Sequence, residues 1–214
     1  MTTKRSRILL ADDHPLIVEA FRALLSPQMN VVGIFFDGRT LVEKAPKLEP
    51  DVAVLDIAMP MLNGLEAGRQ LRKILPNIKL VYLTVNEDPE VASDAMKNGA
   101  SGYLLKKSVA KELFKAIETA LHDRQYITPA IEKAMKDLFI RNGANTPRRD
   151  ELTPRQREVI QLLAEGKPMK EVAYILGVTM RTVAFHKYQV MEERGLRSTA
   201  SLVQFAIRNH ILAQ

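Results

Sequence analysis

The sequence contains no cysteine, which excludes a disulfide framework and a thiolate metal site. It also has no apolar run near the roughly 18 residues that a membrane-spanning helix needs. The basic amino-terminal segment is followed only by the short apolar run 8–11, which is too brief for a signal peptide. No internal repeat is visible. From these absences we expect a soluble cytoplasmic protein with no membrane partner.

Composition and charge suggest two parts of different character. The 214 residues, 46% of them hydrophobic, suffice for one large domain or two small ones with packed cores. Residues 1–122 hold 16 Lys and Arg against 15 Asp and Glu, whereas residues 152–214 hold 9 against 5. A small basic domain is typical of nucleic-acid binding, although charge alone is weak support for that function.

Four short apolar runs, each typical of a buried strand, end in residues suited to one chemical task. The residues at these ends are Asp12 and Asp13, then Asp56, Thr84 and Lys106. The separations between them suit crossovers that contain a helix. In an open parallel sheet, ligands bind outside the carboxyl ends of the strands, so we expect these side chains to converge.

Three carboxylates around one point repel each other and call for a divalent cation. Oxygen ligands with no local His or Cys favour magnesium over zinc. Beside such a cation, Lys106 and Thr84 would neutralise and hydrogen-bond a phosphoryl group, and Asp56 would be the nucleophile that forms an acyl phosphate. Each residue also has an ordinary explanation: Asp13 as the cap of a helix that begins at Pro15, for example.

Five strand–helix units predict an α/β fold, a flavodoxin-like doubly wound five-stranded parallel sheet in the order 2-1-3-4-5. Helices are expected at about 15–25, 41–48, 65–75, 89–98 and 108–123, with Ser108 as a plausible cap for the last. A further helix is expected at 129–140. The stretch 141–150 is polar, contains Gly and Pro and lacks apolar periodicity, which indicates a linker.

Residues 1–123 resemble the receiver domain of two-component response regulators. The residues that carry the resemblance are Ala11-Asp12-Asp13-His14-Pro15, Leu55-Asp56-Ile57-Ala58-Met59-Pro60, Asn63-Gly64, Leu83-Thr84 and Gly99-Ala100-Ser101-Gly102-Tyr103-Leu104-Leu105-Lys106. The resemblance implies that Asp56 accepts a phosphoryl group from a sensor histidine kinase. It also implies that Asp13, Asp56 and the carbonyl of Ala58 hold Mg²⁺, with Asp12 acting through water.

Residues 152–214 predict four short helices. Thr153-Pro154 is typical of a helix start, and Thr179 and Ser198 are expected to cap the third and fourth helices. Gly177 separates the second helix from the third, which fits a helix-turn-helix whose second helix enters the major groove of DNA. The bare helical pattern is a weak signal for that function.

This stretch also resembles the LuxR-type output domain. The carrying residues are Leu152-Thr153-Pro154-Arg155-Gln156-Arg157-Glu158-Val159, Leu162-Leu163-Ala164-Glu165-Gly166, Lys170-Glu171-Val172-Ala173, Leu176-Gly177-Val178, Thr182-Val183 and His186. Together with the receiver, this implies a response regulator of the NarL/FixJ type, with a linker at 124–151. Such a protein regulates transcription and is not a turnover enzyme. Its implied partners are a sensor histidine kinase, double-stranded promoter DNA and, when phosphorylated, a second copy.

The expected recognition helix, 180–193, differs in sequence from the recognition helices that are common in the family. The candidate DNA contacts are Lys170, Arg181, Thr182, Ala184, Phe185, Lys187, Tyr188 and Arg197. Val183 and Val190 share the inward stripe, and Phe185 lies about 200° round from Val183, so it should face outward. An outward Phe is either incidental surface or a reader of thymine methyl groups.

The mechanism that links the two parts is implied by the resemblance. The phosphoryl group would draw Thr84 towards it, and Tyr103 would rotate into the space left behind. In the last helix Leu202, Phe205 and Ala206 would form either a dimer seam or core. The alternative function is a phosphorylation-independent transcription factor whose receiver serves as a dimerisation or partner-binding module.

Overall fold

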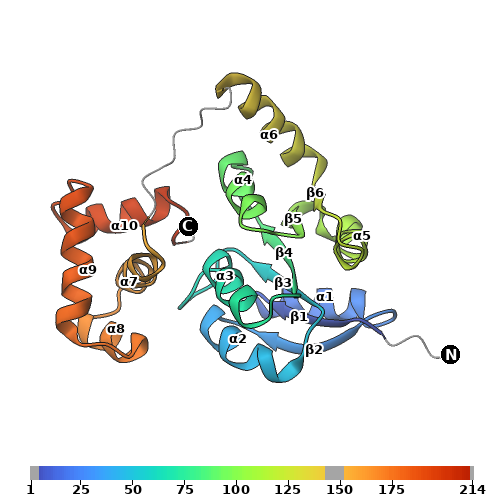
Figure 1. The fold of residues 1–214 in the computed structure, drawn as a ribbon, viewed down its shortest axis with the longest axis horizontal. Coiled ribbons are helices and arrows are strands. Elements are labelled where there is room, and N and C mark those ends of the chain that lie inside the picture. Colours follow the sequence, from blue (N-terminus) through green and yellow to red (C-terminus); the bar gives the residue numbers. More distant parts are fainter. Residues whose placement is uncertain (1–4, 143–151, 213–214) are drawn as a thin grey trace. The chain divides into compact units, whose positions relative to one another are not determined.

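The computed structural model describes residues 5–142 and 152–212, which form two compact units. One unit holds the strands and helices α1 to α6, and the other holds helices α7 to α10 (Figure 1). Of the predicted polar stretch 141–150, residues 143–150 lie outside the described residues. Within the described ranges, no helix is long and apolar enough to cross a membrane.

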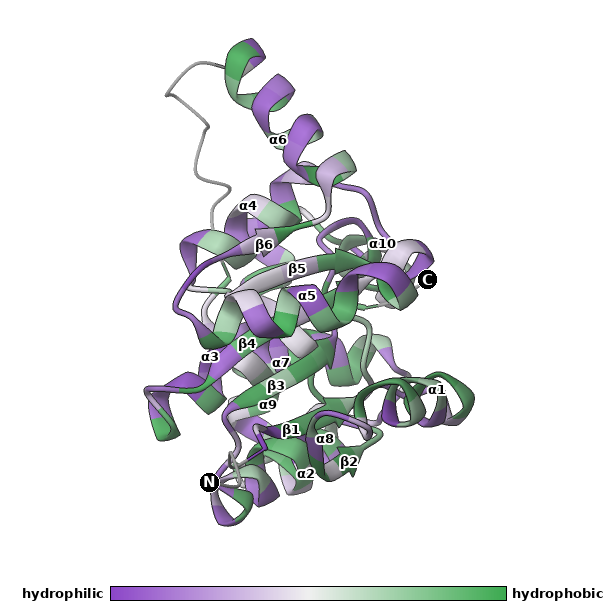
Figure 2. Ribbon diagram, turned by 90° about the vertical axis from the view of Figure 1, so that its right-hand side faces the viewer, coloured by the Kyte–Doolittle hydropathy of each residue, from purple (hydrophilic) through white to green (hydrophobic). Residues whose placement is uncertain are grey.

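The first unit is built on a six-stranded sheet with the order β2-β1-β3-β4-β5-β6, and every neighbouring pair is parallel. The strands are β1 (Arg7–Ala11), β2 (Asn30–Phe35), β3 (Val52–Asp56), β4 (Lys79–Thr84), β5 (Gly102–Leu105) and β6 (Tyr126–Ile127). The predicted order 2-1-3-4-5 is confirmed. The short β6 was not predicted, and it pairs only with Gly102 and Tyr103 of β5. The central strands are strongly hydrophobic (Figure 2).

Helices cover both faces of this sheet. They are α1 (Pro15–Leu25), α2 (Gly38–Lys44), α3 (Gly64–Ile74), α4 (Pro89–Lys97), α5 (Val109–Leu121) and α6 (Pro129–Asn142). Helices α1 and α5 share one apolar core with alternate strand residues, among them Val54 and Val81. Helix α3 lies against Leu80 and Tyr82, which flank Val81 and therefore point to the other face. The expected helix at 129–140 is present as α6.

One predicted helix start was wrong, and one predicted cap residue stands at its helix start but makes a different hydrogen bond. The helix expected at 41–48 begins at Gly38, because the side chain of Asp37 accepts a hydrogen bond from the Thr40 amide and caps it. Its last turn, Ala45–Leu48, is a 3-10 turn that contains Pro46. Ser108 does not cap α5 with its side chain, since its hydroxyl donates to the carbonyl of Leu105 instead.

The second unit consists of four helices, as expected. They are α7 (Pro154–Ala164), α8 (Met169–Leu176), α9 (Met180–Glu193) and α10 (Thr199–Arg208). Thr153, Thr179 and Ser198 cap α7, α9 and α10 through their side chains. Gly177 adopts a left-handed conformation (φ 62°) and ends α8, which lets the chain turn into α9.

The core of this second unit contains the inward residues of α9 and α10. Val183 and Val190 are fully buried, as their spacing predicted. Leu202 and Ala206 are fully buried in the same core, which favours the core alternative over a dimer seam for these two residues. Phe205 packs against that core and remains partly exposed.

Candidate functional site

The carboxyl ends of four adjacent strands deliver the predicted polar residues to one edge of the sheet. Asp56 and Thr84 are the last residues of β3 and β4, while Asp12 and Lys106 directly follow β1 and β5. The Lys106 Nζ lies 2.7 Å from Asp12 Oδ2 and 2.9 Å from Asp56 Oδ2. The predicted convergence is therefore present for Asp12, Asp56 and Lys106, and Thr84 ends the strand beside that of Asp56.

Burial dominates the electrostatics of this cluster. Asp12 and Asp56 are only 2% and 1% exposed. Burial raises the pKa of Asp56 above its usual value, against the opposing effect of the Lys106 ammonium. Burial alone would lower the pKa of Lys106, but Asp56 and Asp12 together outweigh it and raise that pKa. The lysine thus stays charged, and two carboxylates share one counter-charge.

The site also contains Asp13 and, unexpectedly, His14. Ligand atoms of Asp12, Asp13, His14 and Asp56 all lie within 4.8 Å of one another. The His14 Nδ1 is 3.0 Å from Asp12 Oδ1 and 2.8 Å from Asp13 Oδ1. The expectation of a site with no histidine nearby was wrong. Reading Asp13 as a helix cap is also wrong, because His14 occupies the N-cap position of α1 and its side chain makes no cap hydrogen bond.

The donor set fits a hard divalent cation. Three carboxylates supply oxygen ligands, and two of them, Asp12 and Asp56, are buried with one lysine to balance them. The Ala58 amide hydrogen-bonds the Asp56 carboxylate and lowers its pKa, so the loop after β3 is tied to this side chain. Gly64 packs closely against the backbone of this loop: a Cβ there would lie 2.0 Å from the Asp56 carbonyl oxygen. No larger residue fits at Gly64 without backbone movement.

The two predicted switch residues lie on neighbouring strands. Thr84 is 4% exposed, and its hydroxyl accepts a hydrogen bond from the Asn86 amide. Tyr103 is fully buried, which raises its pKa, and the Thr84 side chain opposes that shift. The ring of Tyr103 thus occupies the inward position, beside Thr84.

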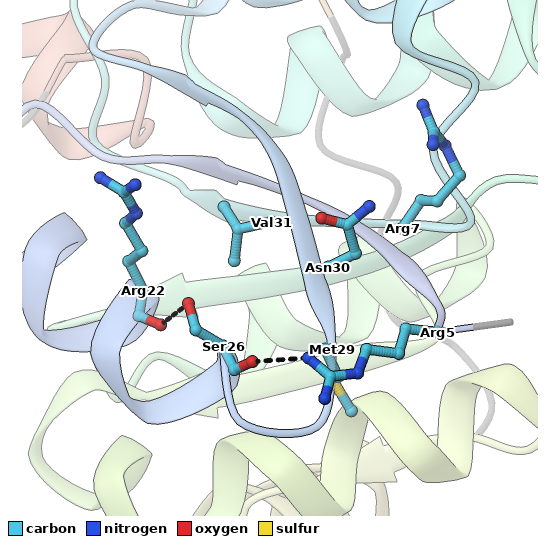
Figure 3. Close-up of a pocket in the computed structure, with 7 residues that line it drawn as sticks. All are labelled: Arg5, Arg7, Arg22, Ser26, Met29, Asn30 and Val31. Carbon is cyan, nitrogen blue, oxygen red and sulfur yellow. Dashed lines mark hydrogen bonds between the residues drawn. The ribbon is translucent and has the colours of Figure 1, made fainter. Parts of the chain in front are cut away.

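A hollow of about 400 Å³ in this unit is not part of the site. It is lined by Arg5, Arg7, Arg22, Ser26, Met29, Asn30 and Val31. Arg7 and Asn30 are the first residues of β1 and β2, so this pocket lies at the amino ends of the strands. The three guanidinium groups point in different directions (Figure 3), and that of Arg7 already donates to the carbonyls of Leu48 and Glu49.

Helix α9 of the second unit presents an outward stripe with unusual chemistry. Phe185 is 62% and Tyr188 57% exposed, and Arg181 is exposed as well. The predicted outward orientation of Phe185 is confirmed. Lys187 is half-buried, and its Nζ lies 5.4 Å from the centre of the Tyr188 ring. Among the other candidate contacts, Lys170 and Arg197 are exposed, while Thr182 and Ala184 are partly buried.

Comparison with known proteins agrees with both halves of this geometry. Residues 8–118 match the family described as "Response regulator receiver domain", and residues 150–206 match "Bacterial regulatory proteins, luxR family". The nitrate/nitrite response regulator protein NarL of Escherichia coli K12 is 35% identical over 194 residues, which cover 89% of this chain and 90% of that protein. The transcriptional regulatory protein MctR of Rhizobium johnstonii is 31% identical over 210 residues, 97% of this chain and 96% of that protein.

A solved structure is also similar along nearly the whole chain. It shows RcsB from Salmonella enterica serovar Typhimurium bound to a promoter in the presence of a phosphomimetic, with a TM-score of 0.62 and 25% identity, and the match covers 97% of this chain and 98% of that one. The strand-end acidic pocket, the helix-turn-helix and these matches lead to one conclusion. The chain belongs to the NarL/LuxR family of response regulators: it is a two-component DNA-binding regulator whose acidic pocket is the site of phosphorylation, and not a turnover enzyme.

Proposed function

We propose that Asp56 is the phosphoacceptor, that a sensor histidine kinase is the donor, and that the reaction requires Mg²⁺. The observation that carries this proposal is the position of the Lys106 ammonium, 2.7 Å and 2.9 Å from two buried carboxylates. A cationic group held there is suited to bind the oxygens of a phosphoryl group on Asp56, and the Thr84 hydroxyl supplies a further donor.

The proposed cation ligands are Asp13, Asp56 and the backbone carbonyl of Ala58, with Asp12 acting through water. The oxygen-rich donor set and the burial of Asp12 and Asp56 support this assignment. A bound Mg²⁺ supplies positive charge to the oxygens of the incoming phosphoryl group. His14 Nδ1 lies 2.8 Å from Asp13 Oδ1, so a cation at that oxygen would share it with the imidazole or use the other oxygen of Asp13.

The proposed output is a homodimer that binds double-stranded promoter DNA in the cytoplasm. Thr84 and Tyr103 form the switch: movement of Thr84 towards the phosphoryl group would favour the inward position that the Tyr103 ring already occupies here. The burial of both side chains on adjacent strands supports a coupled pair. The promoter-bound structure of RcsB, obtained with a phosphomimetic, supports the link between phosphorylation and DNA binding.

The proposed DNA contacts fall into two classes. Lys170, Thr182, Lys187 and Arg197 bind phosphates, which positions the domain without specifying sequence. Phe185 and Tyr188, with Ala184 and Arg181 beside them, meet the base edges. The exposed ring of Phe185 suits thymine methyl groups, which are the apolar features of the major groove.

One experiment tests the proposal against its alternative. Wild type and Asp56→Asn are incubated with acetyl phosphate and MgCl₂, and intact mass and affinity for selected promoter DNA are then measured. We expect a phosphoryl mass increase and tighter DNA binding for wild type only. An unchanged mass together with undiminished DNA binding would instead favour a phosphorylation-independent regulator whose receiver pairs subunits or partners.

A further inference from the structure

The hydroxyl of Thr128 joins three elements of the first unit at one buried point. Thr128 follows β6 directly and is 3% exposed. Its Oγ1 accepts a hydrogen bond from the Leu105 amide at 3.2 Å and donates one to Glu112 Oε2 of α5 at 2.7 Å. A buried hydroxyl with both its donor and its acceptor used is a rigid connection, because each lost bond would strand a polar group.

The backbone of Thr128 makes further bonds to the same neighbourhood. Its amide donates to the carbonyl of Tyr103 at 3.0 Å, which continues the ladder between β5 and β6. Its carbonyl accepts from the amides of Ile131 and Glu132, the first turn of α6. Thr128 is therefore at once the end of the sixth strand and the beginning of the helix that follows.

The side chain of Thr128 replaces a main-chain acceptor. In a continued parallel strand, the Leu105 amide would bond the carbonyl of Thr128, whose amide already bonds the carbonyl of Tyr103. Here the Thr128 carbonyl accepts hydrogen bonds from the first turn of α6 instead. The Thr128 hydroxyl therefore accepts the hydrogen bond of the Leu105 amide in its place. Valine, which has nearly the same shape, would leave the Leu105 amide without this acceptor.

This contact lies one residue from the phosphorylation chemistry. Leu105 directly precedes Lys106, whose ammonium must stay between Asp12 and Asp56. We propose that Thr128 is a positioning residue, which holds the Lys106 end of β5 in place and ties it to the first turn of α6. The inference rests on the phosphorylation of Asp56 proposed above and adds a residue outside the pocket to that reaction.

The first test measures the position of Lys106 without any phosphodonor. An amine-reactive acylating reagent is applied to the full chain, and labelling of Lys106 is measured by peptide mass spectrometry. The neighbouring Lys107, which is 64% exposed, serves as the internal reference. We expect Thr128→Val to raise labelling of Lys106 about fivefold, in line with the loss of one buried hydrogen bond. Thr128→Ser retains the hydroxyl and should label like wild type.

The matched control is Thr119→Val in α5. The Thr119 hydroxyl is exposed and donates only to the Lys115 carbonyl of its own helix, so the same chemical change there should not alter labelling of Lys106. If Thr128→Val does not fold by circular dichroism, Thr128→Ala removes the hydroxyl without placing a methyl group against the Leu105 amide. Thr128→Ala must then show the increase in Lys106 labelling.

The second test measures chemistry and coupling. The initial rate of phosphorylation from acetyl phosphate with MgCl₂ should fall about fivefold in Thr128→Val and recover in Thr128→Ser. In wild type, acetyl phosphate should also change hydrogen exchange at the Ile131 and Glu132 amides, and Thr128→Val should abolish that change.

The two proposals fail in different ways. If wild type takes up no phosphoryl group, the phosphorylation of Asp56 is wrong, while Lys106 labelling still decides the role of Thr128. If Thr128→Val lowers thermal stability but leaves Lys106 labelling at the wild-type level, Thr128 only supports the fold and the positioning role is overturned.

Discussion

The Lys106 ammonium lies 2.9 Å from Asp56 and 2.7 Å from Asp12, so one cation compensates two buried carboxylates. Removing it leaves two negative charges in a site that water scarcely reaches. We therefore expect Lys106→Met to destabilise the receiver by about 3 kcal/mol in urea unfolding. Added MgCl₂ should recover part of this loss, because a cation replaces the missing charge.

The neighbouring Lys107→Met is the matched control. Lys107 is 64% exposed and pairs with Glu87 at the surface, where an ion pair contributes little. We expect its urea midpoint to stay near that of wild type. Equal losses in the two variants would mean that the buried charge balance does not govern stability here.

His14 competes with a cation for carboxylate oxygens. Its Nδ1 contacts Asp12 Oδ1 and Asp13 Oδ1 at 3.0 Å and 2.8 Å. His14→Ala removes this competitor, so the MgCl₂ concentration that half-saturates phosphorylation from acetyl phosphate should fall about threefold to tenfold, the effect of roughly one hydrogen bond. His122→Ala, an exposed histidine bonded only to the Glu118 carbonyl, should leave it unchanged. If the half-saturating MgCl₂ concentration stays at the wild-type value in His14→Ala as well, His14 does not compete with the cation.

Gly64 is required by close packing behind the pocket. An added Cβ would lie 2.0 Å from the Asp56 carbonyl oxygen, and only a backbone shift can relieve that contact. Gly64→Ala should destabilise the receiver by about 2 kcal/mol or more. Because the backbone of Asp56 must shift, the stimulation of phosphorylation by MgCl₂ should also become smaller. Gly166→Ala meets no atom within 4 Å and should cost only the strain of a positive φ, about 1 kcal/mol. The comparison separates steric from conformational effects in thermal denaturation.

Two neighbouring residues of α9 should affect DNA binding differently. Phe185 is 62% exposed, and we expect Phe185→Ala to relax sequence preference at one or two base pairs. Lys187→Ala should weaken binding to all sequences and reduce the slope of log affinity against log salt by about 1. Salt-titrated binding to a set of single-base variants measures both. A change of preference in Lys187→Ala with none in Phe185→Ala would reverse the assignment.

The strand ends were predictable because each follows a run of buried apolar residues. Asp56 after its run and Lys106 after another could be located by pattern alone, and parallel pairing then brings them together. The caps at Thr153 and Thr179 were equally visible, since a side-chain oxygen before a helix is a local signal.

Other features depend on contacts between distant segments. The two residues of β6 are too few to show any periodicity, so their pairing with β5 could not be predicted. The role of Thr128 depends on Leu105 and Glu112, which lie 23 and 16 residues away. His14 was visible in the sequence, but its turn back onto Asp12 is set by the geometry at the start of α1.

The short strand β6 also has a consequence for how the sheet meets other molecules. It covers the outer side of β5 with a single brief segment, after which the chain leaves as α6. An uncovered strand is a template on which another chain can add its own backbone. Because β6 is only two residues long, the free strand edge at this end of the sheet is short, and a backbone that paired there would gain few hydrogen bonds.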